Sequence, residues 1–259
     1  MLAVVSPAKS LSENPRDPGL PLSTPEFLDD AESLVRKLKR MSARQLCELM
    51  SISDKLGQLN RERFNNWTSE TDVDAAHPAI TYFAGDVYQG LEPDSFTRAQ
   101  FKFVDKHLRI LSGLYGSIRP LDAIQAYRLE MGTRLSTKRG SHLYDFWGDR
   151  IARSLNSQLK AIKSNTLVNL ASNEYFDSID RSAIDAEVVT PVFKDLKKDA
   201  YRIVSFFAKR ARGSMVREIV KGKLKKAEEL KSVTFDGYEF REDMSNTHQF
   251  VFTRDTKPE

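Results

Sequence analysis

Two short apolar runs, far apart in the chain, restrict the possible folds most strongly. LAVVS at positions 2–6 and NTLVNLAS at positions 165–172 both have the composition of buried strands. Between them lie apolar stripes with helical spacing, among them one over 27–38 and another over 146–162. This pattern predicts a single domain over residues 1–259, of the α/β to α+β class, with a mixed β-sheet flanked by helices.

The C-terminal part of the chain adds further elements to this expected sheet. Segments 186–195 and 200–210 contain many β-forming residues and predict two strands that pair as a hairpin. Residues 214–231 predict a helix, and segments 233–243 and 248–255 predict the last strands. A chain of 259 residues is long enough to bury a substantial core.

The composition indicates a soluble cytoplasmic protein. The longest apolar runs, such as IVSFFA at positions 203–208, are far too short to cross a bilayer, so no membrane partner is expected. The N-terminus has no basic region and becomes polar at Ser6, unlike a signal peptide. The only cysteine, Cys47, cannot form an intramolecular disulfide, which agrees with a reducing compartment.

Basic residues are distributed unevenly, although the net charge is only +4. Residues 209–226 include eight basic residues and one acid. Three of the basic residues are expected at the junction between the strand over 200–210 and the next helix: Lys209, Arg210 and Arg212. Cations beside a helix N-terminus are well placed to bind phosphate, and Gly213 permits close backbone approach. A solvated helix face is the alternative interpretation.

The motif SPAKS directly follows the first expected strand. Ser6 and Lys9 have the S-x-x-K spacing that serine acyl-transfer enzymes use, but the companion S-D-N and K-T-G motifs are absent. The alternative is a turn capped by Ser6 that presents Lys9 at the carboxyl end of the strand. Phosphate groups commonly bind at such a position.

The second strand ends in a similar way, in NLASNEYF. Ser172 or Asn173 can cap a helical turn that carries Glu174, and both strand ends could face one crevice. Plain helix caps are the alternative. In FAGDVYQGL, Asp86 is either a site carboxylate or a turn former. If the chain is an enzyme, its candidate catalytic residues are Lys9, Asp86 and Glu174.

Cofactor and metal motifs are missing from the sequence. The glycine patterns match neither a P-loop nor a dinucleotide fingerprint. The four histidines are scattered without ligand spacing, and neither H-E-x-x-H nor C-x-x-C occurs. We therefore expect no bound cofactor and no dedicated metal site.

The stretch LRILSGLYGSIRPLDAIQAYRLEMG, residues 108–132, combines a helical pattern with glycines, a proline and three arginines. Helix, tight glycine turn and helix form a helix–hairpin–helix, whose hairpin offers N–H groups to a DNA phosphate. We expect such an element near 104–126, although two residues rather than one separate Gly113 and Gly116. A fold corner without a DNA contact is the alternative. Arg128 and Glu130 are expected to pair.

Seven blocks of this chain, in order, resemble the YaaA-type peroxide-stress-resistance family of bacteria: SPAKS, ISDKLGQLN, FAGDVYQGL, the 108–132 stretch, LYDFWGD, NLASNEYF and FFAKRARGSMVREI. The resemblance implies a cytoplasmic protein that helps cells survive peroxide, limits free iron and oxidative DNA damage, and binds duplex DNA in a positively charged cleft. On the matching blocks, it places these cations in the cleft: Lys9, Lys55, Arg109, Arg119, Arg128, Lys209, Arg210 and Arg212.

These observations lead to a main functional hypothesis and a rival from another class. The main hypothesis is binding to the backbone of double-stranded DNA, because no base-reading helix motif is present. The rival is an enzyme that acts on a nucleotide, a phosphorylated substrate or damaged DNA in the same cleft. Iron storage ranks last because clustered ligands are absent. No obligate protein partner is evident.

Overall fold

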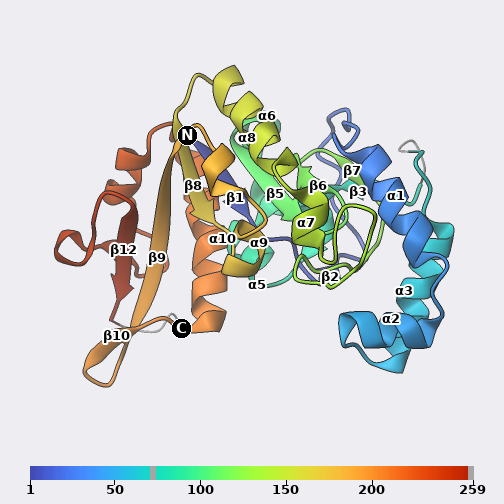
Figure 1. The fold of residues 1–259 in the computed structure, drawn as a ribbon. Coiled ribbons are helices and arrows are strands. Elements are labelled where there is room, and N and C mark those ends of the chain that lie inside the picture. The colour runs from blue at the N-terminus through green and yellow to red at the C-terminus, as the bar shows by residue number, and fades with distance from the viewer. Residues whose placement is uncertain (71–73, 256–259) are drawn as a thin grey trace.

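Five parallel strands form the centre of an eight-stranded sheet in the computed structural model, which describes residues 1–70 and 74–255 (Figure 1). From one edge to the other, seven strands follow in the order β11 (Glu239–Phe240), β12 (Gln249–Arg254), β9 (Glu187–Lys197), β8 (Thr166–Leu170), β1 (Leu2–Val5), β5 (Leu108–Ser112) and β6 (Gly116–Ile118). The eighth, β10 (Ala200–Arg202), pairs with β9 as an antiparallel hairpin. The predicted mixed sheet is confirmed.

The chain reverses its direction of travel across the sheet at β1. It passes first from β1 to its neighbour β5, and then returns to the other side of β1 to add β8, β9 and β12. The five parallel strands therefore have the order 2-1-3-4-5 of a doubly wound sheet. In such sheets, ligands bind beyond the carboxyl ends of the strands at the point of reversal, which here lies between β1 and β8.

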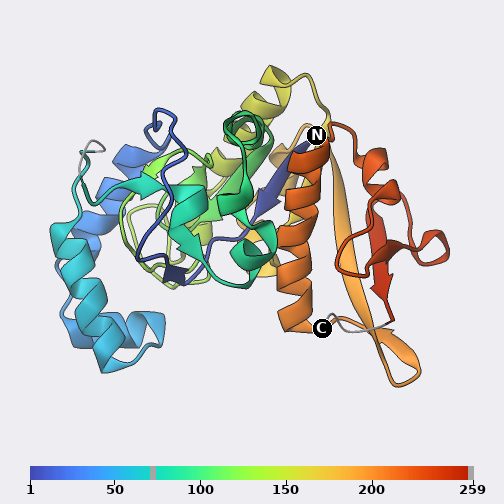
Figure 2. The ribbon, with the colours of Figure 1, turned by 180° about the vertical axis from the view of Figure 1, so that it is seen from behind.

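Helices cover both faces of the sheet (Figures 1 and 2). One face carries α5 (Asp86–Leu91), α6 (Arg98–His107) and α10 (Ser205–Gly222), and the other carries α7 (Leu143–Trp147), α8 (Arg150–Ala161) and α9 (Asn173–Phe176). Three helices lie beyond the β6 edge: α1 (Leu28–Leu38), α2 (Ala43–Met50) and α3 (Asp54–Asn66). Smaller elements connect these layers: β2 (Ser10–Leu11) with β4 (Phe83–Ala84), β3 (His77–Pro78) with β7 (Ala123–Ile124), and α4 (Ala79–Tyr82).

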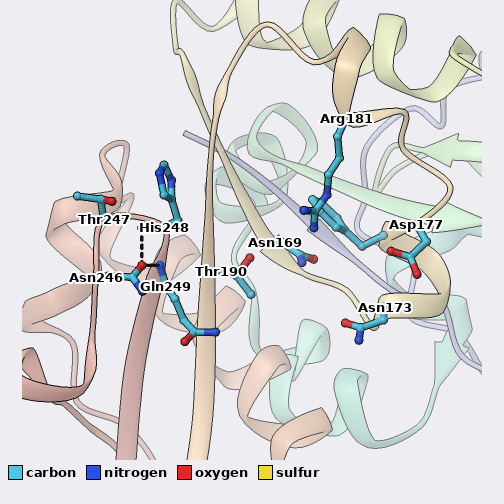
Figure 3. Close-up of a pocket in the computed structure, with 10 residues that line it drawn as sticks. Asn169, Asn173, Asp177, Arg181, Thr190, Asn246, Thr247, His248 and Gln249 are labelled. Atoms are coloured by element: carbon cyan, nitrogen blue, oxygen red, sulfur yellow. Dashed lines mark hydrogen bonds between the residues drawn. The ribbon is translucent and has the colours of Figure 1, made fainter.

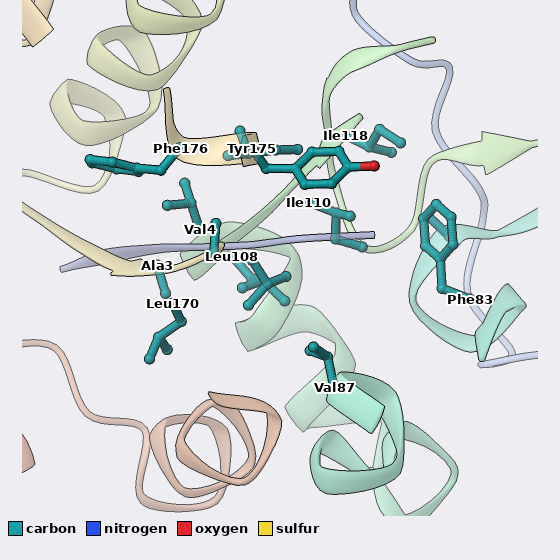
Figure 4. Close-up of a cluster of buried hydrophobic side chains, with 14 of the residues drawn as sticks. Ala3, Val4, Phe83, Val87, Leu108, Ile110, Ile118, Leu170, Tyr175 and Phe176 are labelled. Atoms are coloured by element: carbon teal, nitrogen blue, oxygen red, sulfur yellow. The ribbon is translucent and has the colours of Figure 1, made fainter. Parts of the chain in front are cut away.

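Apolar side chains of the central strands form the core between these layers (Figure 4). Val4, Ile110 and Leu170 are fully buried, and they come from three adjacent strands. Strands buried on both faces need no polar alternation, which explains the continuous apolar runs in the sequence. Tyr175 of α9 reaches across this cluster toward Phe83.

Two glycines allow α5 and α10 to touch backbone to backbone. A Cβ atom at Gly213 would collide with the carbonyl oxygen of Val87, and one at Gly90 would collide with that of Arg210. The predicted close approach at Gly213 is confirmed, but the partner is a helix of the same chain. This contact holds α10 in a fixed position against the sheet.

The helix–hairpin–helix element expected near 104–126 is not confirmed. Helix α6 ends at His107, and β5, a tight turn and β6 follow as a β-hairpin. The apolar spacing of α6 continues into Leu108 and Leu111, but parallel pairing of β5 with β1 extends this segment. Tertiary pairing therefore overrides the local helical pattern.

The strand predicted over 200–210 is mostly wrong. Its first residues form β10, and the hairpin with β9 is confirmed, but α10 begins at Ser205. The buried residues of α10 include Ala208, Ala211 and Met215, which have helical spacing. Lys209, Arg210 and Arg212 therefore lie within a helix and not at its junction with a strand.

Candidate functional site

The ends of β1 and β8 meet at the point where the sheet reverses. The hydroxyl of Ser6, directly after β1, donates to Ser172 Oγ at 3.2 Å and accepts from the Ser172 main-chain N–H at 2.9 Å. The Ser6 carbonyl also accepts from the Tyr88 hydroxyl at 3.3 Å. The two strand ends that the sequence singled out thus face each other. Ser6 is bonded to Ser172 and Lys9 to another group, so no Ser–Lys dyad forms.

Lys9 and Arg128 share one carboxylate at this end of the sheet. Lys9 Nζ lies 2.6 Å from Glu130 Oε2, and Arg128 Nη2 lies 2.9 Å from Glu130 Oε1. The predicted Arg128–Glu130 pair is confirmed. The Lys9 side chain is 61% exposed, whereas those of Arg128 and Glu130 are 17% and 23% exposed. We call Lys9, Arg63, Arg128 and Glu130 the carboxyl-end cluster.

Arg63 of α3 adds a second guanidinium to this cluster. Burial, the largest cause, lowers the pKa of Arg63, and the positive charge of Arg128 lowers it further. The Nε atom of Arg128 is buried and has no hydrogen-bond partner among the described residues. Two cations therefore pair with one carboxylate, a third cation lies close enough to Arg128 for their charges to interact, and one guanidinium N–H is unsatisfied. Such a cluster favours an anion.

Glu174 fixes the segment that carries Glu130. Its Oε1 atom accepts from the Gly132 main-chain N–H at 3.0 Å, and this bond joins the loop after β8 to the 128–132 segment. Asp86 is the half-buried first residue of α5, and its neighbour Gly85 lies close to Ala8. Lys9, Asp86 and Glu174 therefore come from three segments that meet at the carboxyl end of the sheet.

Three tyrosines form a buried layer beneath the cluster. Burial, the largest cause, raises the pKa of Tyr88, Tyr127 and Tyr175, and Tyr127 lies close enough to raise the pKa of Tyr88 and Tyr175 further. Tyr127 and Ser112 share a hydrogen bond of 2.6 Å between their hydroxyls. The tyrosines stay neutral at physiological pH and form a fixed, partly polar support for the charged residues above them.

Helix α10 begins at the same end of the sheet. The N-terminal amine of Met1 donates to the Lys225 carbonyl just beyond α10, so α10 runs opposite to β1. Lys209 and Arg210 are exposed near its start. Arg212 is half-buried and has no side-chain partner among the described residues, and burial lowers its pKa. These cations lie at the end of the molecule that carries the carboxyl-end cluster.

Arg109 and Arg119 lie elsewhere, in a cavity of about 360 Å³ beside α8, which we call the α8 cavity. The buried Arg109 guanidinium donates to the carbonyls of Asp105 and Leu108 and to Gln158 Oε1. Burial lowers its pKa to about 10. Arg119 Nε donates to Asp122 Oδ1 at 2.9 Å. Protein groups therefore occupy most donors of both guanidinium groups.

Asp122 is the fully buried carboxylate of the α8 cavity. Burial raises its pKa to about 6, although bonds from Ser23 and Arg119 act in the opposite direction. Lys55, the remaining predicted cation, is exposed on α3, in the helix pair α2–α3 that extends away from the sheet (Figure 1). The eight predicted cations thus do not share one site.

Residues 1–70 and 74–255 form neither a membrane-spanning helix nor a cluster of metal ligands. In this part of the chain, no helix has both the length and the apolar character needed to cross a membrane. The same residues include no group of three or more His, Cys, Asp or Glu side chains that could hold a metal ion.

Comparison with known proteins assigns the chain to a family. The family model described as "Peroxide stress protein YaaA" matches residues 1–244. The chain belongs to the YaaA family of peroxide stress proteins. The resemblance stated from the sequence blocks is therefore confirmed over nearly the whole chain.

Relatives of similar length share about half of their residues with this chain. A UPF0246 protein of Saccharophagus degradans is 50% identical over 254 residues, covering 98% of this chain and 99% of the relative. UPF0246 proteins of Teredinibacter turnerae and Idiomarina loihiensis are 47% and 48% identical over 254 residues each. Each alignment again covers 98% of this chain, and it covers 99% and 98% of the relative, respectively.

Sequence reasoning missed Arg63 and the three tyrosines of this YaaA-family site. Arg63 stands in a polar helix among other charged residues, and no local pattern separates it from a solvated side chain. The tyrosines read as ordinary core residues. One signal was present for Tyr88 and Tyr175, since each lies a few residues from a singled-out polar residue, Asp86 or Ser172.

Proposed function

We propose that this chain is a cytoplasmic protein of the peroxide stress response that binds the phosphate backbone of duplex DNA. The observation that carries the proposal is the carboxyl-end cluster, where Lys9 and Arg128 share the single carboxylate of Glu130 and the charge of Arg63 lies close to Arg128. A phosphate oxygen can compete with Glu130 for the exposed Lys9 ammonium, and the charge of the neighbouring Arg128 adds to the attraction. The site would therefore hold phosphate without reading base sequence.

Helix α10 extends this surface with Lys209 and Arg210, which are exposed at the same end of the sheet. Duplex DNA is a row of phosphates, so contacts along such a surface add to one another. Arg109 and Arg119 are not part of the proposed surface because protein groups occupy most of their donors. Binding by this route needs no helix–hairpin–helix.

The same contacts give a physical route to protection from iron and peroxide. Lysine and arginine side chains that neutralise phosphates release the cations condensed on DNA. Ferrous iron held on the backbone would be among the released cations, and peroxide would then react with it farther from the sugars. Bound protein also covers part of the backbone.

Fluorescence anisotropy with a labelled duplex tests the proposal. We expect binding at low salt and a loss of affinity of at least about tenfold in Lys209→Ala/Arg210→Ala, because two phosphate contacts disappear. The matched control is Lys225→Ala/Lys226→Ala, which removes the same charge at the opposite end of α10. Absence of binding at low salt, or equal losses in both double variants, would contradict the proposal.

A second candidate function rests on the polar groups that meet at the reversal point of the sheet. Ser6, Lys9 and Glu174 converge where doubly wound sheets commonly bind ligands, which suits an enzyme acting on a nucleotide, a phosphorylated substrate or damaged DNA. For damaged DNA, Lys9 would be the amine that forms a Schiff base. Borohydride trapping on abasic DNA tests this: an adduct that disappears in Lys9→Ala supports the enzyme, and no adduct excludes this lyase chemistry.

A further inference from the structure

A second cavity, of about 570 Å³, lies over β8, β9 and β12, on the face of the sheet that carries α9 (Figure 3). We call it the strand cavity. Its walls come from α9 and the turn after it, from the strands, and from the loop before β12. Its volume falls within the range of pockets that hold small organic ligands.

Several polar side chains of the strand cavity lack hydrogen-bond partners among the described residues, although Asn246 Oδ1 accepts from the main-chain N–H groups of His248 and Gln249. Asn169 is only 6% exposed; its Oδ1 accepts from the Ala171 N–H, while its amide nitrogen has no partner among the described residues. Within residues 1–70 and 74–255, the side chains of Asn173, Thr190 and Gln249 make no hydrogen bond. The α8 cavity differs, because its charged side chains bond to protein groups: Arg119 to Asp122, Arg109 to two carbonyls and Gln158, and Glu26 to Ser154. The Asn169 amide nitrogen is therefore open to the cavity and can donate to a ligand without breaking a bond inside the protein.

The charges of the strand cavity cancel. Its lining includes one cation, Arg181, and one carboxylate, Asp177. The Arg181 guanidinium lies 5.1 Å from the centre of the Phe176 ring, a cation–π contact with another lining residue. No excess of positive charge selects phosphate here, unlike at the carboxyl-end cluster. The cavity therefore suits an uncharged ligand that is rich in hydrogen-bonding groups.

We propose that the strand cavity binds a nucleobase, presented as a nucleoside or as an unpaired nucleotide of a nucleic-acid strand. Asn169, Asn173 and Gln249 each offer a carboxamide, with a donor and an acceptor side by side, that matches the edge of a base. His248 supplies an exposed flat ring in the same lining, and bases stack on such rings. Together these groups recognise a planar ligand with amide-like edges.

The position of the cavity connects it to the rest of the molecule. Asn173 directly follows Ser172, whose hydroxyl and N–H bond to Ser6 at the end of β1. A nucleotide whose base enters the cavity would thus have its backbone near the reversal point of the sheet. The inference nevertheless stands on the cavity itself and does not require binding to duplex DNA.

Isothermal titration calorimetry with adenosine, guanosine, cytidine and thymidine tests this inference, with ribose and inorganic phosphate as comparison ligands. We expect at least one nucleoside to bind and neither comparison ligand to bind at the same concentration. Asn173→Ala should weaken nucleoside binding about tenfold, as expected for one lost hydrogen-bonding group. Thr190→Leu should abolish it by filling the cavity; if that variant misfolds, Gln249→Ala at the exposed strand start replaces it.

The matched control is Asn65→Ala, an exposed asparagine on α3 far from the strand cavity, which should bind as the unaltered protein does. Competition by a single-stranded oligonucleotide identifies the ligand as an unpaired nucleotide, and a lack of competition identifies it as a free nucleoside. The inference is overturned if no nucleoside binds at millimolar concentration, if ribose binds equally well, or if Asn173→Ala and Asn65→Ala behave alike. If Asn173→Ala loses nucleoside binding but still binds duplex DNA, the strand cavity and the duplex-binding surface are separate sites.

Discussion

The carboxyl-end cluster and the α8 cavity each contain two arginines, but the structure uses them in opposite ways. In the α8 cavity, Arg109 and Arg119 donate to carbonyls, an amide and the buried carboxylate of Asp122. In the carboxyl-end cluster, Arg128 pairs with Glu130, Arg63 lies close to Arg128, and a buried N–H of Arg128 is unsatisfied. The two arginines of the α8 cavity thus bond to protein groups, although Ser117 Oγ in the same lining has no partner among the described residues, whereas a guanidinium N–H of the carboxyl-end cluster is itself unsatisfied.

This difference separates structural cations from binding cations. A guanidinium whose donors are bonded inside the protein stabilises the fold and cannot contact phosphate without breaking those bonds. A cation with exposed or unsatisfied donors can bind an anion at little cost to the fold. Variants at the two sites should therefore affect different measurements: stability for the α8 cavity and DNA affinity for the carboxyl-end cluster.

The largest expected effect is on stability, from Arg109→Ala. The change leaves two carbonyls and the Gln158 side chain without their donor in a buried place, and it should lower the free energy of unfolding by about 3 kcal/mol. Urea denaturation followed by circular dichroism measures the loss. The surface change Lys209→Ala should stay within about 0.5 kcal/mol. Similar losses of unfolding free energy in both variants would contradict the distinction between structural and binding cations.

A smaller effect is expected on DNA affinity, from Lys9→Ala. Loss of one phosphate contact should weaken duplex binding by about fivefold to tenfold in low salt while the unfolding free energy stays nearly constant. Lys55→Ala, on the projecting α3, should change the affinity less. Anisotropy titrations of both variants, side by side, give the comparison, and a larger effect at Lys55 would place the binding surface on the α2–α3 pair.

Removal of the Glu130 carboxylate should raise the affinity for duplex DNA, whereas removal of a cation lowers it. Glu130→Gln keeps a hydrogen-bond acceptor for Arg128 but frees Lys9 from its ion pair, so duplex affinity should rise roughly threefold. Asp180→Asn, an exposed carboxylate on the turn before Arg181, removes the same charge as a control. A fall in affinity for Glu130→Gln would show that Glu130 positions the cations and does not compete with phosphate.

The smallest expected effect is the raised pKa of a single carboxyl group, Asp122 in the α8 cavity. Burial raises the pKa of Asp122 to about 6, so its carboxyl carbon should titrate near pH 6 in NMR spectra. Because the folded-state pKa lies above the unfolded value, the folded protein binds the proton more tightly. The stabilising contribution is then complete below about pH 4 and disappears as the pH rises through 6. A midpoint near pH 4 would show that the Arg119 bonds outweigh burial.

The sequence predicted the carboxyl end of the sheet well because its signals are local. Capping residues directly after two apolar runs placed Ser6 and Ser172 at neighbouring strand ends, and the structure joins them by hydrogen bonds. The Arg128–Glu130 pair was also predictable, since side chains two residues apart lie on one face of an extended segment.

Long-range packing decided what the sequence did not predict. Residues 108–112 continue a helical apolar spacing, and only their pairing with β1 makes them a strand. The basic run looked like one surface, yet Gly90 and Gly213 fix α10 so that Lys209 and Arg210 are exposed and Arg212 is half-buried. The strand cavity has no motif, because its walls come from segments far apart in the chain.

The salt dependence of duplex binding tests the central claim most directly. Four contacts, from Lys9, Arg128, Lys209 and Arg210, predict a log–log slope of affinity against salt of about −3.6. The slope should fall to roughly −1.8 in Lys209→Ala/Arg210→Ala and stay at the original value in Arg119→Ala, whose donors are bonded inside the α8 cavity. A flat slope for the unaltered protein, or an equal change in both variants, would contradict the assignment of phosphate binding to the carboxyl end of the sheet.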